Sequence, residues 1–217
     1  IQTLQDATDL IGDDETITSK IRDLTAQYRD DAISNAKAAF DKGKDYESAL
    51  RIISEALSVV GEDDTLQKAK ETYEEYVPVD LTSIEPYAQN GSMEIGTDGV
   101  TDTLGNHYDT YLRGYMDIDD FEGGSYYVWD IGKKYSTLTA IGIAPDWSKG
   151  SSYTCSFKIY GDGRTLYSKS NISADTKPFS VVVDITGITD LKVEMYGGGN
   201  MGISGISSVL CNVMLQK

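Results

Sequence analysis

The sequence is poor in the residues that most metal, nucleophile and nucleic-acid chemistries require. It contains one histidine (His107), two cysteines, and 19 basic residues against 35 acidic ones, which gives a formal net charge of −16. A thiolate or imidazole zinc site needs more ligands than these, and a Ser/His/Asp triad would depend on this single histidine. A chain this acidic is unsuited to neutralising phosphates, so we expect no nucleic-acid partner.

Long apolar runs are also absent. No stretch approaches the roughly 18 apolar residues that a membrane-spanning helix requires, so we expect no membrane contact by this fragment. With 217 residues, of which 40% are apolar, the chain suits one ordinary or two small globular domains that each bury a core.

The composition of the chain changes near Pro78. Only three of the 21 glycines and four of the 15 tyrosines precede this residue. A stretch poor in glycine and tyrosine that gives way to a rich one indicates helices followed by strands. The sequence therefore predicts two domains, a helical one at residues 1–77 and a β-sandwich at residues 78–217.

The first domain has the spacing of about three helices. Apolar residues recur every three or four positions from Ile17 onward, which predicts a long helix ending near Gly43. A second helix takes Asp45 as its N-cap, and a third begins after Asp63 or Asp64. The short turns between them predict antiparallel packing.

The stretch from Tyr28 to Gly61 resembles one tetratricopeptide repeat, a helix-turn-helix unit of about 34 residues. Small or apolar residues occupy the positions that such a repeat requires: Ile33, Ala36, Phe40, Ala49, Ile53 and Ala56. The sequence departs from the pattern at Gly61, where proline is usual. Two interpretations stay open, a packed helical spacer and the end of a longer array that binds a protein partner.

The second domain consists of short runs rich in β-branched and aromatic residues, each bounded by turn residues. Eight such runs are present, at residues 111–118, 125–131, 137–144, 153–160, 164–168, 179–185, 191–196 and 207–215. With no helical interruption, they predict an all-β sandwich of two antiparallel sheets, most simply a jelly roll.

Loop lengths indicate which end of the sandwich carries a site. If consecutive strands run antiparallel, three short links fall at one end and four longer connections at the other. The longer ones are residues 119–124, 145–152, 169–178 and 197–206. Because binding residues concentrate on loops held by a rigid scaffold, the long-loop end is the candidate site.

The side chains of these loops suit a sugar, which packs its C–H face on an aromatic ring and needs hydrogen-bond partners for its hydroxyls. Trp147, next to Asp146, is the best single candidate. The other candidate ligand-binding residues are Phe121, Asp120, Tyr126, Asn171, Asp175, Tyr196 and Asn200. An alternative is that Trp147 and Phe121 fold inward and close the end of the sandwich. Trp129 is expected in the core.

An acidic group on the first long loop raises the question of a metal. Asp119, Asp120 and Glu122 offer oxygen ligands for a structural Ca²⁺, although a solvated acidic loop with no cofactor explains the same residues. Carboxylates are abundant, but sequence cannot show a catalytic pair across a cleft, so we expect binding without turnover and no catalytic residue.

Cys155 and Cys211 are both expected on the core side of their strands, as free thiols or as a disulfide.

Several segments of the second domain together resemble the NPCBM family of carbohydrate-binding modules, which is associated with glycoside hydrolase family 98. They are residues 123–131, 138–144, 157–167 and 183–193, including the Gly-Asp-Gly turn at 161–163 and the Asp-Ile-Thr-Gly segment at 184–187. The family commonly has an Asp-His-Ala-Asp-Trp-like run near its C-terminus, where this sequence has Gly-Ile-Ser-Gly-Ile at 202–206.

This resemblance implies a galactose-binding-like jelly roll, non-catalytic binding of a glycan, and a bacterial protein that is extracellular or attached to the cell surface. We take galactose- or fucose-containing glycans as the expected ligands. The alternative function is a protein-interaction or surface scaffold protein that uses the helical repeat, with the sandwich as a structural part.

Overall fold

The computed structural model of the chain describes residues 1, 3, 6, 14–114, 124–200 and 204–217. It divides into two compact units, Ile1–Val77 and Pro78–Lys217. The boundary lies where the composition of the sequence changes. Each unit is described by itself below.

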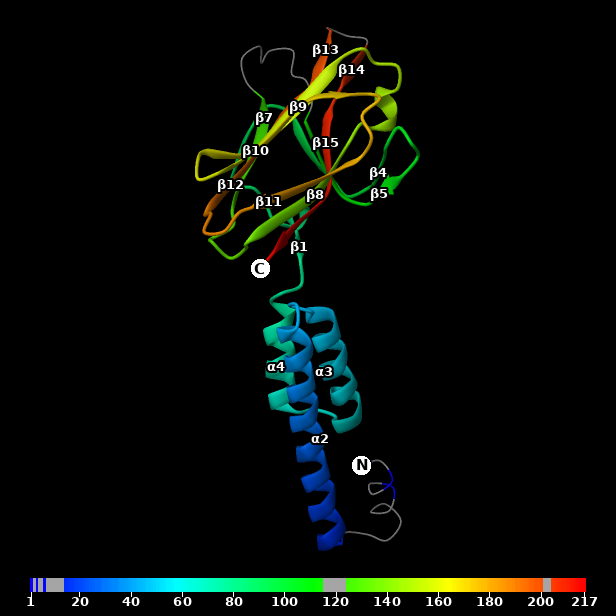
Figure 1. Ribbon diagram of the computed structural model, residues 1–217, viewed down its shortest axis with the longest axis vertical. Helices are drawn as coiled ribbons and strands as arrows, with labels where there is room; N and C mark the ends of the chain where they lie inside the picture. Colours follow the sequence, from blue (N-terminus) through cyan, green and yellow to red (C-terminus); the bar gives the residue numbers. More distant parts are fainter. Residues whose placement is uncertain (2, 4–5, 7–13, 115–123, 201–203) are drawn as a thin grey trace. The chain divides into compact units, whose positions relative to one another are not determined.

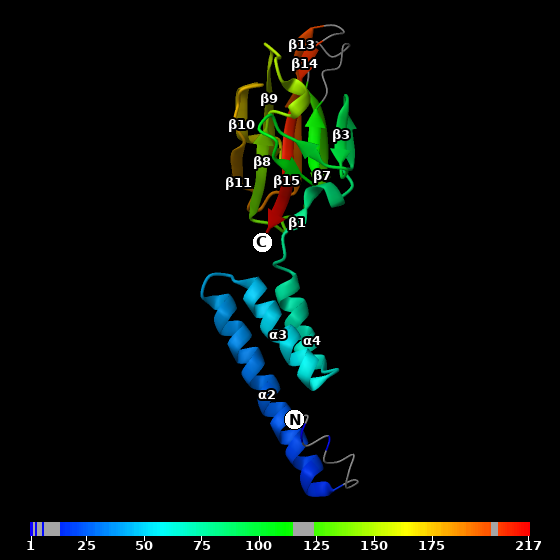
Figure 2. The same cartoon turned by 90° about the vertical axis from the view of Figure 1, so that its right-hand side faces the viewer.

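The first unit contains the three expected helices, α2 (Glu15–Asp41), α3 (Tyr46–Val60) and α4 (Asp64–Glu74), which pack side by side (Figures 1 and 2). Each begins at an aspartate whose carboxylate accepts hydrogen bonds from backbone N–H groups of the first turn, which otherwise have no partner. These N-caps are Asp14, Asp45 and Asp63. Within the described residues, no helix is both long and apolar enough to cross a membrane.

The helical core consists of small residues at the helix contacts and aromatic residues at one end. Ala36, Ala49 and Ile53 have no exposed surface. The ring of Phe40 lies 5.3 Å from that of Tyr73 and 4.6 Å from that of Tyr76, measured between centroids. The apolar face predicted for α3 and for the C-terminal half of α2, from Ala32 onward, is therefore buried, whereas Tyr28 in the predicted face of α2 is exposed. The likeness to a tetratricopeptide repeat stays a prediction.

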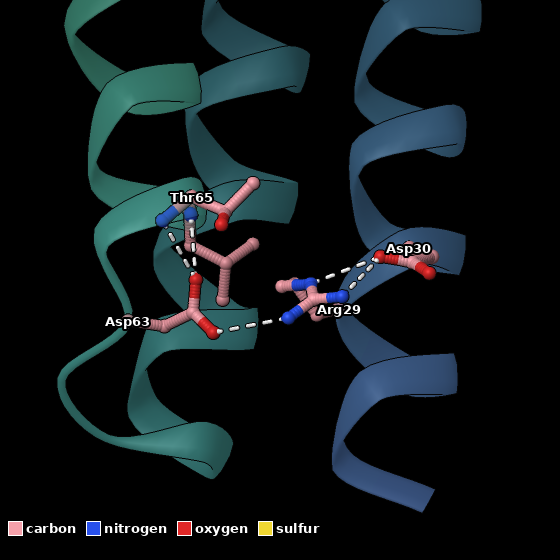
Figure 3. A network of polar contacts seen from close by, with 5 residues as sticks. Arg29, Asp30, Asp63 and Thr65 are labelled. Atoms are coloured by element: carbon pink, nitrogen blue, oxygen red, sulfur yellow. Dashed lines mark hydrogen bonds and ion pairs between the residues drawn. The ribbon is translucent and has the colours of Figure 1, made fainter. Parts of the chain in front are cut away.

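One polar network links the first helix to the start of the third (Figure 3). Asp63 accepts hydrogen bonds from the backbone N–H groups of Thr65, at 2.8 Å, and Leu66, at 2.9 Å. The second carboxylate oxygen of Asp63 lies 3.8 Å from the guanidinium of Arg29 on α2, which also pairs with Asp30 at 2.9 Å. The cap of α4 thus also serves as a contact between α2 and α4.

The second unit is a sandwich of two antiparallel sheets, as predicted (Figures 1 and 2). The six-stranded sheet has the order β11-β8-β15-β6-β3, with β1 also paired to β15, and the five-stranded sheet has the order β10-β9-β12-β7-β2. The strands of the six-stranded sheet are β1 (Val79–Asp80), β3 (Met93–Gly96), β6 (Tyr111–Gly114), β8 (Thr137–Ile143), β11 (Phe179–Asp184) and β15 (Ser208–Gln216). Those of the five-stranded sheet are β2 (Ala88–Asn90), β7 (Ser125–Asp130), β9 (Thr154–Gly161), β10 (Arg164–Ser173) and β12 (Asp190–Tyr196).

Two small hairpins and two short 3₁₀ helices complete this unit. They are β4 (Val100–Thr101) with β5 (His107–Tyr108), β13 (Gly198–Asn200) with β14 (Ser204–Ile206), η1 (Leu81–Ser83) and η2 (Asp146–Ser148). The eight predicted strands are all present in the described residues, although 115–118, expected to continue β6, lie outside them. The strands that the sequence did not predict are two to four residues long, too short to show an alternating pattern.

The sandwich core lies between the sheets and contains Trp129, Phe157 and Ile159, all without exposed surface. The expectation that Trp129 belongs to the core is confirmed. A second, smaller cluster lies on the outer face of the six-stranded sheet, around Val100 and Tyr111 near the β4–β5 hairpin.

The expectation that Cys211 faces the sandwich core is wrong, and a β-bulge is the reason. The pairing of β15 with β8 shifts register between Cys211 and Met214, and Asn212 has a φ of 48°. One extra residue in a strand exchanges the two faces, so Leu210 and Val213 point into the sandwich core while Cys211 joins the outer cluster. Cys155 lies in the sandwich core, and both thiols are free.

Candidate functional site

The strand register places the described long connections at one end of the sandwich. Ile143, at the end of β8, pairs with Val209 near the start of β15, and Thr154, at the start of β9, pairs with Ser173 at the end of β10. The connections 144–153 and 174–178 and the described parts of the last connection, 197–200 and 204–207, therefore meet at this end, which we call the rim. The connection before β7 is described only at Gly124.

Two of these connections contain more regular structure than the sequence indicated. Strand β10 continues to Ser173 through a bulge between Lys169 and Ile172, which shortens the loop expected at 169–178. Residues 197–206, expected as an open loop, include the β13–β14 hairpin. Both segments are rich in Ser, Asn or Gly, which weakens the strand signal.

Trp147 is the exposed aromatic residue among the described residues of the rim. It lies in η2, and 47% of its surface is exposed, so it does not fold inward. The neighbouring residues fix this turn, because the hydroxyl of Ser148 donates a 2.6 Å hydrogen bond to the carbonyl of Pro145, and Lys149 pairs with Asp146. The indole is therefore held at the surface by a short turn rather than by a long loop.

Arg113 lies against Trp147, with its guanidinium carbon 4.4 Å from the centre of the indole. It extends from the outer face of β6, where its Nε donates a 3.3 Å hydrogen bond to the hydroxyl of Ser207. Its Nη1 lies 3.7 Å from Glu94 on β3, a carboxylate that also accepts a 3.1 Å hydrogen bond from Tyr111. Trp147, Arg113 and Glu94 thus form a continuous group that offers a ring, a donor and an acceptor, the functions that a sugar requires.

Arg113 and Glu94 were not predicted as site residues. The available signal was the alternation of β6, where Leu112 is apolar and points to the core while the adjacent Arg113 points outward. Glu94 lies directly opposite Arg113 in the β3–β6 ladder, but β3 is too short to be predicted from sequence.

A buried carboxylate supports the loop that carries Trp147. Asp102 has no exposed surface and accepts hydrogen bonds from the backbone N–H groups of Leu104 and Asn106, the side-chain amide of Asn106 and the hydroxyl of Tyr108. Burial alone would raise the pKa of Asp102, but these hydrogen bonds outweigh it and lower the pKa. Asp102 also forms a β-bridge with Pro145, so this network anchors the start of η2.

Tyr126 and Tyr196, expected at the same site, lie on the other side of the sandwich. They belong to the outer face of the five-stranded sheet, where they flank Glu194 of β12. Since Trp147 contacts the outer face of the six-stranded sheet, the structure does not bring these tyrosines together with it. The sequence placed both tyrosines near strand ends but could not show that their strands belong to the other sheet from the one that Trp147 contacts.

Glu194 organises this second cluster. Its carboxylate is 9% exposed and accepts hydrogen bonds from the hydroxyls of Tyr160, at 2.7 Å, and Tyr196, at 2.8 Å, and from the ammonium of Lys192, at 2.9 Å. Burial opposes ionisation, but these donors outweigh it and lower the pKa of Glu194. The same Lys192 ammonium lies 4.0 Å from the ring centre of Tyr126. The polar groups of this cluster therefore satisfy one another.

The remaining predicted residues are dispersed or not described. Asn171 and Asp175 are exposed at the end of β10, an edge strand of the five-stranded sheet. Asn200 pairs with Ser204 in the β13–β14 hairpin, and its side chain is not described. Asp119, Asp120, Phe121 and Glu122 lie outside the described residues, so the calcium site proposed there stays a prediction. Across 14–114, 124–200 and 204–217, no group of three acidic, histidine or cysteine side chains could hold a metal.

The fold and the rim define a β-sandwich of the galactose-binding-like class, and comparisons with known proteins agree. The model of the NPCBM/NEW2 domain matches residues 65–215, so the chain belongs to the NPCBM/NEW2 family. The match begins within α4. No curated protein matches the chain.

Solved CBM51 modules share the fold. CBM51 from Clostridium perfringens GH95, in complex with methyl-galactose, is 19% identical with a TM-score of 0.50 over 64% of this chain and 100% of that chain. The tandem CBM51 modules of Sp3GH98, the family 98 glycoside hydrolase from Streptococcus pneumoniae, give 16% identity and a TM-score of 0.51 over 64% of this chain and 46% of that one. A Clostridium perfringens ZmpB structure with an M60 catalytic domain and two CBM51 domains is 17% identical, with a TM-score of 0.50 over 65% of this chain and 15% of that chain.

Proposed function

We propose that the β-sandwich binds a glycan without catalysis and that Trp147 provides the stacking surface. The observation that carries this proposal is the exposed indole, held by the η2 turn with the Arg113 guanidinium 4.4 Å away. Family membership supports binding to carbohydrate, and the methyl-galactose complex of a CBM51 neighbour supports galactose-containing glycans.

The test is a calorimetric titration of the whole chain with galactose- and fucose-containing oligosaccharides. A ring contact with a few hydrogen bonds predicts millimolar to micromolar affinity, and Trp147→Ala should weaken it by roughly tenfold to thirtyfold. Val182→Ala, which truncates a side chain that is 64% exposed on β11, is the matched control and should bind as the wild type does. Affinity that is unaffected by Trp147→Ala would contradict the proposal.

For the helical unit we propose a role as a spacer or as a surface for a protein partner. One observation favours the second role, a shallow groove lined by Tyr28, Ala32 and Asn35 of α2 and by Ile52 and Glu55 of α3. A pull-down with wild-type chain and with Tyr28→Ala would separate the two, since a spacer is indifferent to this change.

We also propose, from the resemblance to the family, that the protein is bacterial and acts outside the cell or on its surface. Cleavage by an added protease of the chain on intact cells would support this localisation. The question of calcium at Asp119, Asp120 and Glu122 is decided by titrating Ca²⁺ into chelator-treated protein and into a variant with all three side chains replaced by amides.

A further inference from the structure

Tyr87 is the second exposed aromatic residue of the sandwich. Of the aromatic side chains described in residues 78–217, only Tyr87, at 60%, and Trp147, at 47%, are largely exposed. An exposed ring beside hydrogen-bonding groups offers a flat apolar face on which the C–H face of a sugar can pack. Tyr87 directly precedes β2, on the other sheet from the strands that support Trp147.

A groove of about 640 Å³ adjoins this ring. It follows the side of the sandwich where β2, the edge of one sheet, faces β3, the edge of the other. The groove is lined by Glu85, Pro86, Tyr87, Ala88, Gln89, Met93, Glu94, Ile95 and Tyr127. Its volume is within the range of small-molecule sites, roughly 300 to 1,000 Å³.

The walls of this groove are fixed by hydrogen bonds. The backbone N–H of Tyr87 donates a 2.9 Å bond to the carbonyl of Val128. Tyr127 of β7 donates a 3.0 Å hydrogen bond to the carbonyl of Met93 on β3 and so links the two sheets. A ligand would meet a groove wall whose backbone is already in place, which lowers the entropic cost of binding.

The chemistry of the lining selects the kind of ligand. Glu85, Glu94 and Gln89 offer hydrogen-bond acceptors, and apolar side chains alternate with them. Among the described residues, none that lines the groove is basic. Carboxylates attract hydroxyl and ammonium donors and repel uronate, sulfate and phosphate groups. The groove therefore suits a neutral sugar or an amino sugar.

The groove and the rim share a residue. Glu94 lines the groove, and it also lies 3.7 Å from Arg113, whose guanidinium stacks on Trp147. We propose that the groove beside Tyr87 is a second subsite, which takes a neutral or amino-sugar residue of the same glycan chain that contacts Trp147. This inference rests on the proposed function of the rim.

The experiment compares ligands of two lengths with variants of each subsite. Methyl-galactoside fills one subsite, and lacto-N-neotetraose, a neutral tetrasaccharide ending in galactose, is long enough to reach a second. We expect Tyr87→Ala to weaken tetrasaccharide binding roughly five- to twentyfold and to leave methyl-galactoside unchanged, because only the longer ligand contacts this ring. Trp147→Ala should weaken both ligands.

Two further variants separate the ring from other effects. Tyr87→Phe keeps the stacking face and should bind the tetrasaccharide within about threefold of wild type. Val182→Ala removes an exposed apolar side chain from β11, at the opposite edge of its sheet from β3, and should change nothing. A tetrasaccharide sulfated on its internal N-acetylglucosamine should bind at least threefold more weakly at low salt.

The outcomes distinguish the two proposals. Equal tetrasaccharide affinity of wild type and Tyr87→Ala, while Trp147→Ala is impaired, would overturn the groove alone. An equal loss of affinity for both ligands in Tyr87→Ala would also overturn it, because the substitution would then weaken binding by disturbing the fold rather than by removing a contact. Absence of any binding by the wild type would overturn the rim proposal and the groove with it.

Discussion

At the scale of single residues, the most informative group is Glu194. A carboxylate on the outer face of a sheet would ordinarily be solvated, yet this one is 9% exposed and accepts three hydrogen bonds. Each donor favours the charged form, and together they outweigh burial. The carboxylate holds Tyr160, Tyr196 and Lys192 in place across two strands.

The cluster predicts a pH-dependent contribution to stability. Because the pKa of Glu194 is lower in the folded chain than its ordinary value of 4.5, its contribution is complete above that value and is lost as pH falls through the folded pKa. We expect Glu194→Gln to lower the free energy of unfolding by about 1 to 3 kcal/mol at pH 7. The glutamine amide is neutral, and its NH₂ group would face hydroxyl and ammonium groups that also donate hydrogen bonds.

Urea unfolding of wild type and Glu194→Gln between pH 7 and pH 3 measures this effect. The difference between the two should shrink on acidification. Glu62→Gln, at an exposed position in the helical unit, is the control and should change little at any pH. A difference that is constant over the whole range would show that the charge of Glu194 makes no contribution.

Residue types were predictable from the sequence, but their groupings were not. Trp147 was identified correctly as a loop residue, since Pro145 and Gly150 bound its turn. Its partner Arg113 is 34 positions earlier in the chain, and only the pairing of β6 within the six-stranded sheet brings it close. Tyr126 and Tyr196 share a face because β7 and β12 are neighbours, which depends on long-range pairing that local sequence does not contain.

At the scale of secondary-structure elements, β15 shows where a period-two pattern fails. Val209, Cys211, Val213 and Leu215 alternate perfectly in the sequence, yet the bulge at Asn212 divides them between two clusters. The only local indication is an asparagine, which tolerates a positive φ better than most residues. The bulge lets one strand contribute to the sandwich core and to the cluster near the β4–β5 hairpin.

The bulge makes a prediction about substitutions at Asn212, where φ is 48°. A β-branched side chain is strained in this conformation, so Asn212→Val should lower the free energy of unfolding by about 1 to 3 kcal/mol. Asn212→Gly should remain within about 1 kcal/mol of wild type, because glycine adopts positive φ freely. Chemical denaturation of the three proteins provides the comparison, and equal stability of the valine and glycine variants would contradict a positive φ here.

Helices were easier to predict than strands for a physical reason. Each helix carries its own start signal, an aspartate that accepts hydrogen bonds from the first turn, and its own apolar stripe. The short strands β2 and β3 have no such local signal and exist because neighbouring strands offer hydrogen-bond partners. They are also the strands that form the groove, so the groove could not be predicted from local sequence patterns.

At the scale of the whole molecule, the two units differ in what they contribute to the proposed site. The rim, the groove and their supporting networks all lie in residues 78–217, and so does the sandwich core. The family model nevertheless begins at residue 65, inside α4. The family boundary and the structural boundary thus differ by one helix.

This difference gives a final prediction. Since the sandwich core includes no side chain of the helical unit, a fragment of residues 78–217 should fold and bind methyl-galactoside within about twofold of the affinity of the whole chain. A second fragment, residues 65–217, retains α4 but loses α2 and α3, so Leu66 and Tyr73, buried in the complete unit, would be exposed. We expect it to bind equally well but to be less soluble. Circular dichroism and calorimetry of both fragments measure folding and affinity, and failure of 78–217 to fold while 65–217 does would assign α4 to the carbohydrate-binding domain.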